Sequence, residues 1–121
     1  MHCVEQGKKW RSYQSFTYCY SYRETGDSTF PYMICAFTPE SGVPSGFTSA
    51  EIPAATWAVF TTKEYKIEDT SKFVQALWKR IYTEWFPSSG YEHGICGELE
   101  IYGVADNTKE YCEIWISVVK K

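Results

Sequence analysis

Several features that would point directly to a function are missing from this sequence. No apolar run approaches the roughly 20 residues of a membrane-spanning helix, and the first residues lack the apolar segment of a signal peptide. The net charge is −3 and no stripe of Lys and Arg marks a nucleic-acid surface. No glycine-rich loop leads from a strand into a helix to hold a nucleotide phosphate. We therefore expect a cytoplasmic protein that by itself contacts neither membrane nor nucleic acid.

The cysteines also lack the spacing that would give them a chemical role. There is no CxxC pair, and neither His2 nor His93 stands in a ligand pattern with cysteine or carboxylate. An odd number of cysteines argues against a complete disulfide framework. We expect no metal and no cofactor. The five cysteines are Cys3, Cys19, Cys35, Cys96 and Cys112.

Aromatic residues, in contrast, are abundant. The 121 residues include 10 Tyr, 5 Trp and 7 Phe, so that aromatic side chains make up 18% of the chain. Tyr and Trp combine an apolar ring with a polar tip, which suits half-exposed binding surfaces as well as cores. The composition therefore allows a binding surface built from rings.

The pattern predicts a single α+β domain over residues 1–121, with a mostly antiparallel sheet and a packed helix. The first 12 residues are weakly patterned. The expected helix starts at Asp69 or Thr70, carries a wide apolar stripe as far as Trp85 and is stopped by Pro87. The expected strands are 13–24, 30–37, 51–62, 94–103 and 110–119.

The last two strands place carboxylates among aromatic rings. A turn at 106–107 would set Glu100 opposite Glu113 and Tyr102 opposite Tyr111. A register slip of one residue would mix apolar and polar faces, so we expect it to be disfavoured.

The expected face, which also carries Trp115, has three interpretations. It can be a solvated outer face of the sheet, because polar sheet faces are common. An aromatic wall with a carboxylate at its base can instead bind an organic cation. A shielded carboxyl can also serve as a general acid or base. The residues alone do not choose among these.

Four motifs add a resemblance. The segments EIPAATWAVF, LWKRIYTEWFPSSGYEHG, ELEIY and YCEIWISVVKK stand in the order of the GyrI-like family, also called the AraC-type effector-binding domain. This family includes the ligand-binding domains of Rob-like and BmrR-like multidrug-sensing regulators. The resemblance runs from about residue 30 to residue 121.

The resemblance implies a fold of two β-α-β-β halves with a ligand pocket between them. Residues 51–119 form a complete second half. The first half normally begins with a strand and a helix, and the dozen residues before the first expected strand cannot supply both. We therefore expect an incomplete first half, an unpaired strand edge and self-association as a homodimer.

The resemblance also implies a function and a set of site residues. It favours a stand-alone, multidrug-type protein that binds lipophilic cationic aromatic compounds. The alternative is a hydrolase that opens cyclopropane-bearing electrophilic natural products with paired glutamates, so whether the chain is an enzyme stays open. The carried-over acidic positions are Glu100 and Glu113. The aromatic positions are Trp85, Tyr91, Tyr102 and Trp115, with Tyr32 and Trp57 as weaker candidates.

Two further residues, His93 and Trp78, lie near these positions in the sequence. His93 lies in the loop motif YEHG and is either a surface group or part of a proton relay. Trp78 follows the helical spacing of the apolar stripe, which favours a core position.

Overall fold

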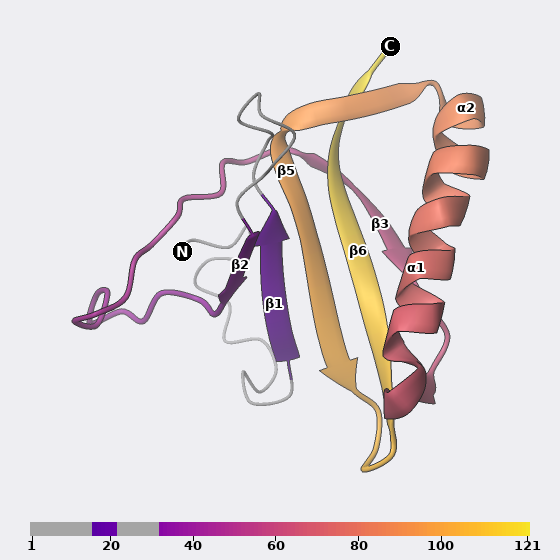
Figure 1. The fold of residues 1–121 in the computed structure, drawn as a ribbon. Helices are drawn as coiled ribbons and strands as arrows, with labels where there is room; N and C mark the ends of the chain where they lie inside the picture. Colours follow the sequence, from indigo (N-terminus) through magenta and orange to yellow (C-terminus); the bar gives the residue numbers. More distant parts are fainter. Residues whose placement is uncertain (1–15, 22–31) are drawn as a thin grey trace.

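A computed structural model of the chain describes residues 16–21 and 32–121 (Figure 1). Within these residues the protein is an α+β domain, as predicted, with a six-stranded antiparallel sheet. The strands lie in the order β2-β1-β5-β6-β3, and β4 pairs with β6. The predicted segment 1–12 and the shortening before the first strand lie outside the described residues.

The elements follow the predicted order from residue 51 onward, as strand, helix, strand and strand. Five strands overlap the predicted ranges, whereas the short β4 was not predicted. The strands are β1 (Phe16–Ser21), β2 (Tyr32–Cys35), β3 (Thr56–Thr61), β4 (Tyr65–Lys66), β5 (Tyr91–Val104) and β6 (Lys109–Lys120). The helical elements are η2 (Ile67–Asp69), α1 (Thr70–Arg80), η3 (Ile81–Trp85) and α2 (Phe86–Ser89).

Each face of the sheet carries an apolar cluster. Figure 1 shows α1 beside β6 and β3, and the long β2–β3 loop extending on the other side of the molecule. Burial of each large apolar side chain stabilises the fold by roughly 1.5–3 kcal/mol. The helix-face cluster has as its buried members Tyr65, Val74, Ile81, Cys112, Ile114, Ile116 and Val118. The loop-face cluster has Tyr18, Tyr20, Ile52, Leu99 and Ile101.

The helix does not stop at Pro87, so that prediction was wrong. Residues 81–85 form a π-helical turn in which the Phe86 N–H bonds to the Ile81 carbonyl. Pro87 then lies in the first turn of α2, where its missing N–H costs little. The helix ends instead at Gly90, whose φ of +76° is the left-handed conformation that favours glycine.

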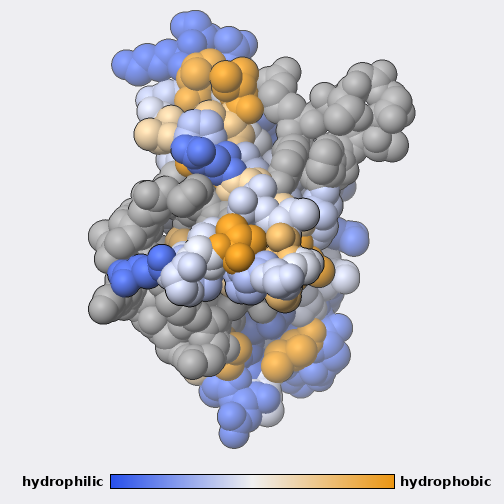
Figure 2. Space-filling model, turned by 90° about the vertical axis from the view of Figure 1, so that its left-hand side faces the viewer, coloured by the Kyte–Doolittle hydropathy of each residue, from blue (hydrophilic) through white to orange (hydrophobic). Residues whose placement is uncertain are grey.

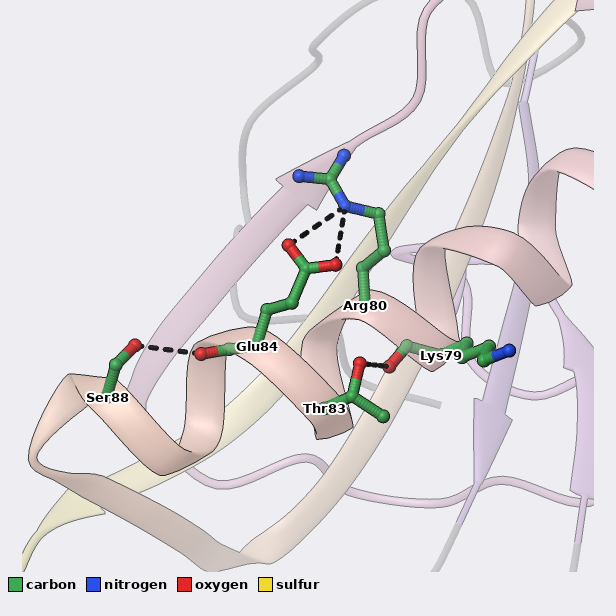
Figure 3. A network of polar contacts seen from close by, with 5 residues as sticks. All are labelled: Lys79, Arg80, Thr83, Glu84 and Ser88. Carbon is green, nitrogen blue, oxygen red and sulfur yellow. Dashed lines mark hydrogen bonds and ion pairs between the residues drawn. The ribbon is translucent and has the colours of Figure 1, made fainter.

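The outer face of the helix is polar (Figure 3). The Thr83 and Ser88 hydroxyls donate to the carbonyls of Lys79 and Glu84, each at 2.8 Å. The Arg80 Nε lies 3.3 Å from the Glu84 carboxylate. Both partners of this pair are largely exposed, so it contributes only a few tenths of a kcal/mol. The polar face keeps the apolar stripe turned toward the sheet.

The hairpin register differs from the predicted one by one residue. Glu100 lies opposite Ile114, and Glu113 lies opposite Ile101. Directly opposed residues share a face, whereas neighbours along a strand alternate. Glu100 therefore points to the helix face and Glu113 to the loop face, so the predicted pairing of the two glutamates was wrong.

The turn explains this register. The Asp106 Oδ1 accepts hydrogen bonds from the backbone N–H groups of Thr108 and Lys109, at 2.7 and 3.0 Å. This side-chain bonding builds a longer loop than the predicted two-residue turn. Because both sheet faces are covered, an apolar set on β5 and an apolar set on β6 can bury on opposite sides.

Candidate functional site

The carboxylate of Glu100 is the centre of a polar cluster on the helix face. Its Oε1 accepts hydrogen bonds from the Tyr32 hydroxyl at 2.8 Å and the Tyr102 hydroxyl at 3.3 Å. Its Oε2 accepts one from the Trp78 Nε1 at 2.8 Å. The three donors come from β2, β5 and α1, and Glu100 itself is half-buried. The fold thus brings two of the predicted aromatic residues to one of the predicted glutamates.

The phenols around Glu100 are held in their protonated form. Burial raises the pKa of Tyr32, and hydrogen bonds to Cys19 and Glu100 raise it further. Burial also raises the pKa of Tyr102, with the charge of Glu100 as the next cause. Both hydroxyls therefore stay neutral donors to the carboxylate at physiological pH.

The charge of Glu100 is not balanced by a basic side chain of the described residues. The ion pairs within these residues join Arg80 to Glu84 and His93 to Glu98. Neutral donors stabilise a carboxylate without cancelling its charge. Within the described residues, the site therefore presents a net negative charge beside aromatic rings.

A column of stacked rings continues from Trp78 along the helix. The ring centroids of Trp78 and Tyr82 are 5.9 Å apart, and those of Tyr82 and Phe86 are 5.6 Å apart. The three residues are spaced by four positions, so the helix places them on one face. The His93 ring lies against Phe86 at 4.7 Å and Tyr82 at 5.6 Å. This ring column leads from Glu100 to the start of β5.

A second carboxylate, Glu98, lies two residues from Glu100 on the same face of β5. Burial raises the pKa of Glu98; a hydrogen bond from Tyr82 opposes this effect and the charge of Glu100 adds to it. Burial, followed by the charge of Glu98, raises the pKa of Tyr82 to about 12. The negative charge of Glu100 thus disfavours ionisation of Glu98.

A bulge in β5 sets the position of these glutamates. The register with β6 shifts between His93 and Glu98. Gly97 has a φ of +84°, and a Cβ at this position would collide with the Ser21 carbonyl oxygen. The buried Ser117 hydroxyl accepts from the Cys96 N–H and donates to the Gly97 carbonyl, both at 3.1 Å. Because β5 continues from here, the bulge decides which of its residues face the helix.

Two other predicted residues lie near Glu113 on the opposite face. The Trp115 Nε1 donates to the Glu113 carboxylate at 3.0 Å. Trp115 packs against Trp57 with ring centroids 6.3 Å apart, and both rings cover the loop-face cluster. These three residues therefore do not share a surface with Glu100.

Trp85 and Tyr91 are on the helix face but pack into its core. Their rings stack at 6.1 Å, and Trp85 meets Phe60 edge-on at 5.0 Å. Both are partly buried against the helix-face cluster. Within the described residues, the donors to the Glu100 carboxylate are Tyr32, Tyr102 and Trp78, so neither of these two residues is among them.

Sequence reasoning missed Trp78, Tyr82 and Glu98 as members of the site. The four-residue spacing of Trp78, Tyr82 and Phe86 was visible, but the same spacing is typical of a core stripe. The alternation of β5 also puts Glu98 on the face of Glu100, but the predicted register would set it opposite Trp115, whereas it lies opposite Ile116. These residues are identified by the hydrogen bonds between the helix and β5. The spacing of residues in the sequence does not predict these bonds.

A separate hollow of about 540 Å³ lies between β2 and the loop that follows it. Figure 2 shows apolar patches on this side of the molecule, separated by polar residues. None of the predicted site residues lines this hollow. Its lining includes Met33, Ile34, Cys35, Phe37, Val43, Pro44 and Phe47.

The described residues contain neither a membrane-spanning helix nor a cluster of metal ligands. No helix there has the length and hydropathy to cross a bilayer. No three His, Cys, Asp or Glu side chains of that part of the chain are grouped so as to hold a metal ion.

Comparison with known proteins gives a family assignment. Neither the search of curated proteins nor the search of solved structures returned a match. The family model described as the GyrI-like small molecule binding domain matches residues 4–119, which is nearly the whole chain. The chain therefore belongs to the GyrI-like family of small-molecule-binding domains.

Proposed function

We propose that the chain binds lipophilic, cationic aromatic compounds against the Glu100 carboxylate. The observation that carries this proposal is a half-buried carboxylate whose hydrogen-bond donors are three neutral aromatic side chains. Tyr32, Tyr102 and Trp78 hold the carboxylate through their polar tips. Their rings then provide apolar surface around a fixed negative charge.

The physical chemistry favours a ligand with a delocalised or quaternary positive charge. Such a cation gains from the negative charge and from the ring faces, by roughly 0.5–2 kcal/mol for each cation–π contact. It is also weakly hydrated, so it loses little on leaving water. A small, strongly hydrated ion lacks both advantages.

The alternative prediction, hydrolysis of cyclopropane-bearing electrophiles by paired glutamates, requires Glu100 and Glu113 in one site. The hairpin register places them on opposite faces of the sheet. That mechanism therefore lacks Glu113 beside Glu100, and we propose binding in preference to hydrolysis.

The experiment is a titration of intrinsic Trp fluorescence with rhodamine 6G, a lipophilic aromatic cation. We expect saturable quenching, because Trp78 belongs to the site. Glu100→Gln should weaken binding roughly tenfold or more, since it removes a charge from a desolvated contact. Circular dichroism checks that each variant is folded.

Glu113→Gln is the matched control, because it makes the same chemical change on the opposite face. We expect its affinity to equal that of the wild type. Equal binding by Glu100→Gln and wild type, or an equal loss in both variants, would contradict the proposal.

A further inference from the structure

Three side chains beside the proposed site form a cluster with a titratable centre. The Tyr82 hydroxyl lies 3.0 Å from the His93 Nε2 and 3.5 Å from the Glu98 Oε1. The His93 Nδ1 lies 3.7 Å from the same carboxylate oxygen. The imidazole also stacks against the rings of Tyr82 and Phe86. Histidine is the side chain whose ordinary pKa, about 6.5, falls in the physiological range.

The hydrogen bonding of this cluster depends on the charge of His93. A neutral imidazole can accept the Tyr82 proton at Nε2, which leaves Glu98 with one donor fewer. A protonated imidazole donates from both nitrogens, so Nε2 must donate to the Tyr82 oxygen. The Tyr82 proton is then available to Glu98, which also faces the charged Nδ1–H. Protonation of His93 thus offsets the charge of Glu98 with an imidazolium and frees a neutral hydroxyl donor for the same carboxylate.

This cluster is coupled to the Glu100 site through packing and charge. Trp78 stacks on Tyr82 and donates to Glu100. Glu98 and Glu100 are alternate residues of one strand, about 7 Å apart along the chain. Among the described residues, the titratable groups that face the imidazole include Tyr82 from the helix and Glu98 from β5, with Glu100 beyond Glu98.

We propose that protonation of His93 lowers the affinity of the Glu100 site for cations. This inference rests on the proposed function and concerns the regulation of the same site. Above neutral pH, Glu98 adds its negative charge to that of Glu100 and attracts the ligand. At acid pH, His93 acts as an internal cation that neutralises Glu98 and repels the ligand.

The test uses tetraphenylphosphonium, whose permanent charge makes any pH dependence a property of the protein. Its dissociation constant is measured by isothermal titration calorimetry at about pH 8 and about pH 5.5, on either side of the histidine range. We expect a rise of roughly threefold to tenfold at the lower pH, the size of one screened charge at this distance. His93→Gln, which stacks and hydrogen-bonds but does not titrate, should reduce the change to less than about twofold.

A second measurement needs no variant. Linkage requires the ligand to disfavour protonation of His93 by the same factor by which protonation weakens binding. The NMR titration midpoint of His93 should therefore fall by about half to one pH unit when tetraphenylphosphonium saturates the wild type. His2, the other histidine of the chain, serves as the internal reference.

The outcomes separate this inference from the function on which it rests. Binding that is independent of pH, an unchanged pH dependence in His93→Gln, or an unmoved His93 midpoint overturns the inference and leaves the proposed function standing. Absence of tetraphenylphosphonium binding at both pH values overturns both.

Discussion

The hydrogen bond between Trp78 and Glu100 links the helix to the candidate site, and its strength can be isolated. We predict that Trp78→Phe and Glu100→Gln are non-additive in a double-mutant cycle, with a coupling free energy of about 1 kcal/mol. The cycle cancels the volume lost on replacing Trp by Phe. Urea unfolding of the wild type, both single variants and the double variant gives the coupling. If the two substitutions lower the free energy of unfolding additively, the 2.8 Å contact contributes nothing to stability.

At the same scale, the sequence predicted part of the Glu100 cluster. The motif ELEIY indicated Glu100 and Tyr102, and Tyr32 was a weaker candidate because its face could not be assigned. Trp78 was assigned to the core, since a helical stripe does not show which member meets a polar strand residue. The role of these residues in binding stays a prediction, which the Glu100→Gln titration addresses.

At the scale of secondary-structure elements, the bulge in β5 depends on one residue, Gly97, that can adopt a positive φ close to β1. We predict that Gly97→Ala lowers the free energy of unfolding by about 2–4 kcal/mol, because positive-φ strain adds to a collision with the Ser21 carbonyl. Gly46→Ala is the matched control, since Gly46 has a similar φ of +87° and open space around its Cβ position. Backbone strain alone should lower the free energy of unfolding of Gly46→Ala by about 1–2 kcal/mol. If chemical denaturation gives both variants the same loss in free energy of unfolding, the close approach of β1 to Gly97 does not contribute to the effect.

At this scale, the sequence predicted where most elements lie but not the hairpin register or the end of the helix. Hydrophobic periodicity located the helix and the strands of the second half, because their apolar residues recur at helical or alternating spacing. The register of β5 and β6 was missed, because it depends on the hydrogen bonds of the Asp106 side chain in the turn. The helix end was missed because a π-helical turn ahead of Pro87 let the proline join a further turn. Both errors concern backbone geometry, which residue type does not specify.

At the scale of the whole molecule, self-association as a homodimer stays a prediction. Within residues 16–21 and 32–121, β3 pairs only with β6 and is an edge of the sheet. Val59 on this strand is 47% exposed. An edge strand with an exposed apolar residue is a template for pairing with a second copy. We therefore expect light scattering at micromolar concentration to give twice the mass of one chain.

The contribution of this edge can be tested with two matched substitutions. Val59→Lys should convert the dimer to a monomer, because a lysine on an edge strand opposes pairing with another strand. Val43→Lys makes the same change at a similarly exposed position, 44%, in the loop between β2 and β3, and it should leave the dimer intact. A wild type that stays monomeric would contradict self-association itself. A dimer that survives Val59→Lys would instead place the interface elsewhere on the molecule.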